Sequence, residues 1–201
     1  MLIIIGLLVG GVTTGSKLIE SSKLNKLVNE ISSIKITYHT FKSIYEMAPG
    51  DLDIAQSYFG TTGIVNGDGD GKIEYSSETL NVPAQLEKAE LLEYRTDGGY
   101  LNLESFDSRV WIIHSLGHAG YFNFPSNNLL QIGAYGLIND AFLTPRQAYK
   151  VDTKLDDGIS KSGKLSYKAH GTVTHTTCSG GGDNYDLTSD EIGCNIVYDI
   201  D

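Results

Sequence analysis

The chain has 201 residues, enough for one globular domain with an extension, and its composition of 40% hydrophobic and 20% charged residues is typical of a folded protein. The formal net charge of -10 argues against nucleic-acid binding, because no basic surface is available to displace phosphate counterions. The charge is uneven: residues 1–50 carry five Lys and three Glu, a net of +2, whereas residues 51–201 carry ten Lys or Arg and twenty-two Asp or Glu, a net of -12.

The first segment is apolar. Residues 1–12 hold only apolar side chains and Gly, and the first charge is Lys17. Sixteen uncharged residues in a helix span about 24 Å, short of the ~30 Å hydrocarbon core of a bilayer. A cleaved signal peptide would begin with basic residues and end at a small-residue site, and this sequence has neither. The segment therefore resembles the truncated start of a membrane helix that continues into the soluble part of the chain.

A heptad pattern follows the apolar segment and predicts an amphipathic helix with one buried face. The residues expected to pack on the head are Leu24, Leu27, Ile31, Ile34, Tyr38, Phe41 and Tyr45. We expect a single spine helix over residues 1–48, about 70 Å long and ending near Ala48-Pro49-Gly50, with a globular head over residues 49–201. A two-helix coiled coil is the alternative, but the all-apolar first third does not suit it.

The head is expected to be α+β, with helices packed on a small antiparallel sheet. Helices are predicted over 51–59, over 76–93 and from Thr144, which precedes Pro145, to Gly158. Strands are predicted over 109–116, 129–134, 165–177 and 195–198.

Two cysteines, Cys178 and Cys194, enclose a Gly-rich stretch near the C-terminus. An exported chain would join them in a disulfide that closes this loop, contributing about 3 kcal/mol in the chain-entropy model. Two unrelated reduced thiols are the alternative.

One acidic loop has the spacing of a calcium site. Asn66-x-Asp68-x-Asp70-Gly71-x-Ile73 reproduces the first eight positions of an EF-hand-type loop, in which alternate oxygen donors converge on one ion. The candidate calcium ligands are Asn66, Asp68, Asp70, the backbone carbonyl of Lys72, Glu74 and Glu78. The alternative is a turn-rich loop that binds no ion.

Other motifs give weaker indications of function. Asp156-Asp157-Gly158, at a predicted helix end, hints at a second cation or a subunit contact, although a solvated turn is the simpler reading. The pairs His114/His118 and His170/His175 lack the Glu of a zinc metalloprotease, and Ser115 has no nucleophile-elbow pattern. We therefore do not expect an enzyme.

The order of these features resembles bacterial type IV pilins and the related pseudopilins. The resemblance covers most of residues 1–165. It is carried by the long helix, by the turn 47–51, by the segment 55–60 and by the two acidic loops 66–71 and 152–158. It implies a pilin fold, with the disulfide-closed loop at its C-terminal end, and a structural subunit of an extracellular filament. The family pairs an early helical Glu with a neighbour's N-terminal amine, and no residue here takes that role.

The resemblance also implies partners and a location. Copies of the chain would pack their apolar helix starts in a filament core. The residues implied for this core are Leu2, Ile3, Ile4, Ile5, Leu7, Leu8, Val9 and Val12. A prepilin peptidase, pilus assembly machinery, a methylated N-terminus and an inner-membrane pool before assembly follow by the same resemblance. A pseudopilin of a type II secretion system, or a membrane-anchored calcium-binding surface domain that never polymerises, are the alternatives.

Overall fold

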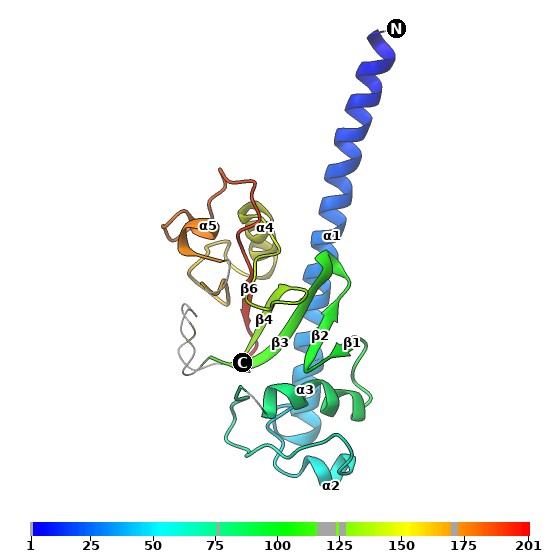
Figure 1. Cartoon of the computed structure of the whole chain (residues 1–201), viewed down its shortest axis with the longest axis vertical. Helices are drawn as coiled ribbons and strands as arrows, with labels where there is room; N and C mark the ends of the chain where they lie inside the picture. Colours follow the sequence, from blue (N-terminus) through cyan, green and yellow to red (C-terminus); the bar gives the residue numbers. More distant parts are fainter. Residues whose placement is uncertain (1, 76, 116–123, 125–127, 170–172) are drawn as a thin grey trace.

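A single long helix dominates the structure. The computed structural model describes residues 2–75, 77–115, 124, 128–169 and 173–201, with side chains from Thr14 onward except at position 175. Helix α1 (Leu2–Tyr45) has 44 residues, which corresponds to a length of about 66 Å. Its N-terminal part projects well beyond the head, and its C-terminal part lies along the sheet (Figure 1).

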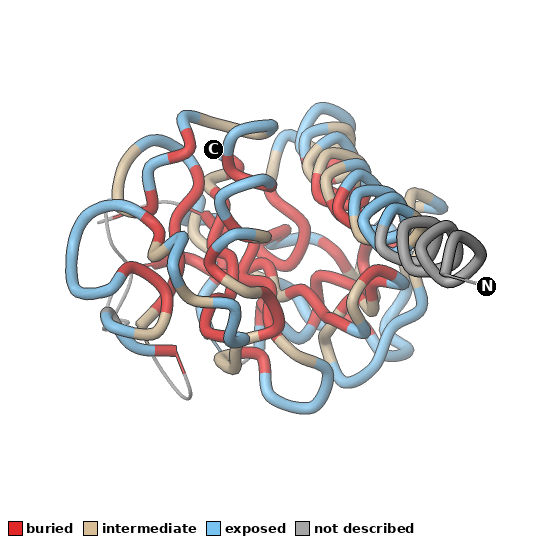
Figure 2. The backbone as a smooth tube through the Cα atoms, turned by 90° about the horizontal axis from the view of Figure 1, so that it is seen from above, coloured by how far each residue is buried: buried red, intermediate tan, exposed pale blue. Residues whose placement is uncertain are grey.

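The heptad face of α1 is the face that packs on the head. The first six of its seven predicted packing residues, Leu24 to Phe41, are buried, and Tyr45 is half-buried against the same core. Seen from above, the buried residues of α1 lie on the side of the helix turned toward the head (Figure 2). Glu30 falls outside the heptad positions, yet it is buried and accepts hydrogen bonds from the backbone N–H groups of Glu104 and Ser105.

The head is built on one antiparallel sheet of six strands in the order β1-β2-β3-β4-β6-β5. The strands are β1 (Arg95–Asp97), β2 (Tyr100–Leu103), β3 (Ser108–His114), β4 (Asn128–Ala134), β5 (Leu165–Ser166) and β6 (Ile196–Asp199). Alternation along β3 directs Val110 and Ile112 into the core shared with α1, and Arg109 and Trp111 toward the opposite face. The predicted α+β fold is therefore confirmed.

The remaining helices surround the sheet. They are α2 (Ala55–Phe59), α3 (Ser77–Lys88), the 3-10 helix η1 (Ser105–Asp107), α4 (Pro145–Leu155) and α5 (His175–Ser179). Helix α4 begins with a capping box, in which Thr144 accepts from the backbone of Gln147 while the Gln147 side chain accepts from Thr144.

Several predicted elements differ from the structure. The strand over 165–177 is wrong: β5 ends at Ser166, and Thr174 accepts a hydrogen bond from the Thr177 backbone at the start of α5. Helix α3 ends at Lys88 rather than at residue 93, and α1 ends at Tyr45, three residues before the expected Ala48. The β1–β2 hairpin, which turns at Gly98-Gly99, was not predicted because its three-residue first strand carries no alternating pattern.

Candidate functional site

The acidic loop that follows α2 is wrapped around Asp51. The two carboxylate oxygens of Asp51 accept hydrogen bonds from the backbone N–H groups of Gly69 (2.8 Å) and Gly71 (3.0 Å), and the residue is buried. Gly67 lies directly on the Asp51 backbone, where an added Cβ would stand 2.3 Å from the Asp51 carbonyl carbon. The sequence therefore needs a glycine at position 67 for the loop to close over Asp51.

Glu78 holds the loop from the other side. This residue lies in the first turn of α3, is buried, and accepts from the backbone N–H groups of Asp68 and Glu74, each at 3.0 Å. One carboxylate oxygen from each of Asp51, Asp68 and Glu78 lies within 4.8 Å of the others. A second grouping of the same kind joins Asp68, Asp70 and Glu74 on the exposed side of the loop.

In the cluster of Asp51, Asp68 and Glu78, burial disfavours the ionised forms of the two buried carboxyl groups. Burial raises the pKa of Asp51, although the N–H groups of Gly71 and Gly69 act in the opposite direction. Burial also raises the pKa of Glu78 to about 7, and its contact with Glu74 adds to the shift. A divalent cation would offset both effects, because it compensates converging carboxylates that otherwise repel each other.

The predicted calcium ligands are only partly brought together. Asn66 turns away, because its Oδ1 accepts from the backbone N–H of Gln56 at 2.8 Å. Asp70 forms an ion pair with Lys72 and also accepts from the Lys72 backbone, and the ion pair lowers the pKa of Asp70. Asp68 and Glu78 converge, and their third partner is Asp51, which sequence reasoning missed. Asp51 stands fifteen positions before Asn66, so no loop motif includes it.

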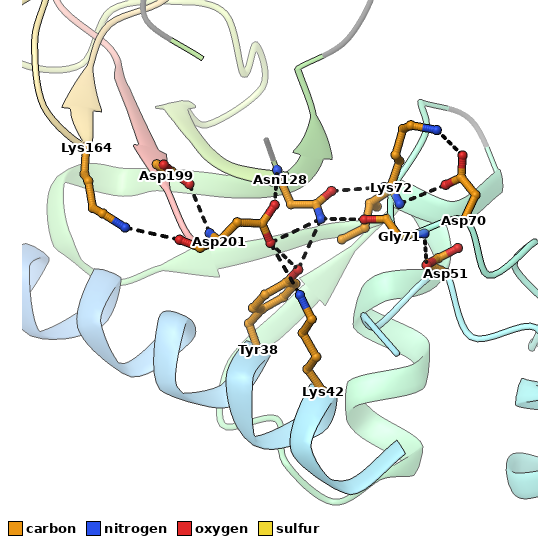
Figure 3. A network of polar contacts seen from close by, with 11 residues as sticks. Tyr38, Lys42, Asp51, Asp70, Gly71, Lys72, Asn128, Lys164, Asp199 and Asp201 are labelled. Carbon is orange, nitrogen blue, oxygen red and sulfur yellow. Dashed lines mark hydrogen bonds and ion pairs between the residues drawn. The ribbon is translucent and has the colours of Figure 1, made fainter. Parts of the chain in front are cut away.

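A polar network joins this loop to the spine helix and to the sheet (Figure 3). Asn128, the first residue of β4, accepts from the backbone N–H of Ile73 (3.1 Å) and donates to the carbonyl oxygen of Gly71 (2.9 Å). Its own backbone N–H donates to the Asp201 carboxylate at 2.8 Å. Tyr38 of α1 donates to the same carboxylate at 3.1 Å, and burial raises the pKa of Tyr38.

The second acidic segment, residues 152–158, forms hydrogen bonds that hold the end of α4 to the rest of the head. Asp152 is fully buried at the end of α4 and accepts from Tyr185 (2.8 Å) and from the backbone of Gly158 (3.0 Å). Burial raises the pKa of Asp152 to about 6. Asp156 accepts from the backbone N–H of Leu165 at the start of β5, and Asp157 accepts from the backbone N–H of Ile159. These contacts tie Asp156 and Asp157 to the chain that follows α4, and one carboxylate oxygen from each of Asp152, Asp156 and Asp157 lies within 4.8 Å of the others.

The C-terminal loop is closed by a disulfide between Cys178 and Cys194, as predicted, and both cysteines are buried. Reciprocal backbone hydrogen bonds between Cys194 and Leu143 anchor the end of this loop beside α4. The loop is therefore tied to the head at both of its ends.

Several predicted positions fall outside the described residues. His118 and His170 are among them, and the side chain of His175 is not described. The implied filament-core residues from Leu2 to Val12 lie in α1, but their side chains are likewise not described. Within the described part of the chain, no helix is both long and apolar enough to cross a membrane.

Comparisons of the chain with protein-family models, with curated proteins and with solved structures gave no match.

Proposed function

We propose that the chain is a structural subunit of an extracellular filament of the type IV pilin kind. The observation that carries the proposal is the division of α1. From Leu24 onward one face of the helix is buried on the sheet, whereas Leu18 and Ile19 in the preceding turns are exposed. The N-terminal part of the helix projects beyond the head (Figure 1). We take this exposed apolar helix surface as a site of contact with other molecules.

The partner that this surface fits is a second copy of the chain. On the face of α1 turned away from the sheet, the exposed side chains of Ile36 and Ile44 border a shallow groove of about 430 Å³. The small side chains of Thr40 and Ser43 also line the groove, together with Lys35 and His39. Small residues between two apolar ones permit the close approach of another helix.

The two apolar surfaces lie at different heights on the same helix. Leu18 and Ile19 precede the groove by about 20 residues, which is about 30 Å along the axis. A contact between Leu18 and Ile19 of one copy and the groove of the next joins two different patches, so it is heterologous. Repeated from copy to copy, such a contact builds a helical filament unless its rotation closes a ring. Apolar residues 2–12 of neighbouring copies would then adjoin in the filament core.

The acidic loop supports calcium binding as a second role. Asp51, Asp68 and Glu78 offer oxygen ligands at a spacing suited to one hard cation. Calcium at this position would order the connection between the spine helix and α3. In this proposal the head faces the cell exterior, and the inner membrane holds the chain before a prepilin peptidase and assembly machinery act on it.

The test is electron microscopy of the fraction sheared from cells that produce Ile36→Lys or Ile44→Lys variants. Ile192→Lys is the matched control, because Ile192 in the head is 65% exposed and Ile36 is 66% exposed. We expect filaments from the unchanged chain and from the control, and few or none from the groove variants.

Two outcomes would reject the proposal. If the groove variants form filaments as readily as the control, the contact of Leu18 and Ile19 with the groove is not what joins the copies. Unchanged chains that remain as membrane-held monomers would favour an anchored calcium-binding surface domain instead.

A further inference from the structure

A cavity opens on the face of the sheet that is turned away from α1. Its volume is about 560 Å³, which is within the range of small-ligand pockets. Strands β2, β3 and β4 contribute Tyr100, Arg109, Trp111 and Gln131 to its wall, and the turn at 136–140 contributes the opposite side. This cavity is separate from the acidic loop and from the groove on α1.

An aromatic platform forms one part of the wall. Tyr100 stacks on Trp111 with ring centroids 4.7 Å apart and planes 3° from parallel, and Tyr75 meets Trp111 edge-on at 5.3 Å. The register of β2 on β3, in which Leu101 pairs with Val110, places Tyr100 opposite Trp111. The strands therefore hold the rings in place before any ligand arrives.

Buried positive charge forms another part. Among the described residues, Arg109 and Lys168 are the buried Arg or Lys side chains, each 8% exposed, and both line this cavity, as does the half-buried Asp140. This is unexpected in a head that carries twenty-two acidic residues against ten basic ones. Burial lowers the pKa of Lys168, which reflects the cost of holding a charge there.

Arg109 is incompletely partnered. Its guanidinium lies 3.7 Å from the centre of the Tyr100 ring and donates to the carbonyl oxygen of Gly136. Its Nε is buried without an acceptor, and Arg109 forms no ion pair with any residue that the structure describes. A carboxylate brought in by a ligand would supply the missing counter-charge.

We propose that this cavity binds a sugar that carries a carboxylate, such as a hexuronic-acid unit of an acidic polysaccharide. Tyr100 lies between Trp111 and the Arg109 guanidinium, so the ring offered to a ligand is that of Trp111. Its negative face attracts the polarised C–H groups on the apolar side of a sugar ring. The sugar carboxylate lies beside Arg109 and Lys168. Asn139 lines the polar side of the wall and accepts from Gln131 through Oδ1, which leaves its Nδ2 to donate to a hydroxyl. Benzoate, a flat aromatic acid, has no hydroxyl to accept from Asn139.

The test uses Trp111, which is the only tryptophan of the chain, as a fluorescent reporter. The full chain is titrated, in a detergent without a sugar headgroup, with trigalacturonate and with its methyl ester, in which a methyl group replaces the negative charge of each carboxylate. We expect a saturable change with the acid and binding at least tenfold weaker with the ester. Calorimetry provides a second readout that does not depend on the aromatic platform.

Substitutions in the cavity wall test whether the sugar acid binds in this cavity. We expect Lys168→Met to weaken binding of the acid at least tenfold, whereas Lys88→Met, at an exposed position of α3, leaves it unchanged. Asn139→Asp adds a negative charge to the wall at a half-buried position and should weaken binding even if Lys168→Met fails to fold.

The proposal is overturned by equal binding of acid and ester, by benzoate binding as tightly as the sugar acid, or by no saturable change. It is also overturned if both wall variants fold and bind as the unchanged chain does. It concerns the head alone, so its failure would leave the filament proposal standing.

Discussion

The side-chain amide of Asn128 donates to the carbonyl oxygen of Gly71 at 2.9 Å, which fixes the middle of the acidic loop to the first residue of β4. The same amide accepts from Ile73. One buried side chain thus satisfies two backbone groups of a loop that has no regular secondary structure.

Replacing Asn128 should loosen this connection. Asn128→Leu leaves the Gly71 carbonyl and the Ile73 N–H without partners, at a cost of about 2–4 kcal/mol in the free energy of unfolding. Urea denaturation measures the loss. Asn184→Leu, at an exposed position, is the control and should change stability by less than about 0.5 kcal/mol. Equal effects of the two substitutions would show that the Asn128 contacts do not stabilise the head.

Calcium should stabilise the head through Asp51, Asp68 and Glu78. A ligand at 100 times its dissociation constant adds about 2.7 kcal/mol, so the melting temperature should rise in calcium and fall in excess chelator. Asp68→Asn should abolish the difference, because it removes an exposed ligand without emptying the buried Asp51 position. Asp97→Asn, which removes the same charge from β1, should preserve it. A melting temperature that is the same in calcium and in excess chelator would exclude the calcium role.

The carboxyl of Glu78 should make stability depend on pH. Its pKa is raised from 4.5 to about 7 in the folded state, so between these values the folded chain holds a proton that the unfolded chain has released. Without calcium, this group makes stability fall as pH rises from about 4.5 to about 7. Denaturation across this window should show a shallower fall for Glu78→Gln. Glu87→Gln, an exposed change on the same helix, should keep the original slope. A slope unaltered by Glu78→Gln would contradict the assignment.

The disulfide should stabilise the head independently of the acidic loop. Replacing both Cys178 and Cys194 by Ala opens a link between positions 16 residues apart, which costs about 3 kcal/mol in the chain-entropy model. Denaturant titration with and without a reductant measures this. The reductant should destabilise the unchanged chain and leave the double variant unaffected. A double variant as stable as the oxidised chain would contradict the expectation.

The elements that could be predicted from the sequence are those whose pattern of apolar residues lies within one continuous segment. Leu24 to Phe41 repeat at helical spacing, so their burial on one face follows from periodicity alone. Residues 165–177 also alternate, but β5 ends at Ser166, and farther along the chain Thr174 and Thr177 exchange hydrogen bonds that start a helix. Local threonine contacts compete there with the extended pattern.

The candidate sites were predicted less completely because their residues come from separate parts of the chain. Asp51 joins Asp68 and Glu78 only after the loop has folded back over it. The cavity on the sheet collects residues from Tyr75 to Lys168, and no motif links them. The single tryptophan was visible in the sequence, but its stacking on Tyr100 depends on the register of two strands, one of which was not predicted.

The position of β6 within the sheet has a consequence for the order in which the chain is made. This strand lies between β4 and β5, and Asp201 bonds to Tyr38, a residue 163 positions earlier. The helix therefore leaves the ribosome long before the segment that completes its packing surface. Until β6 is in place, part of the apolar face of α1 lacks its cover. The packing surface of α1 is therefore complete only after the last residues of the chain have been made.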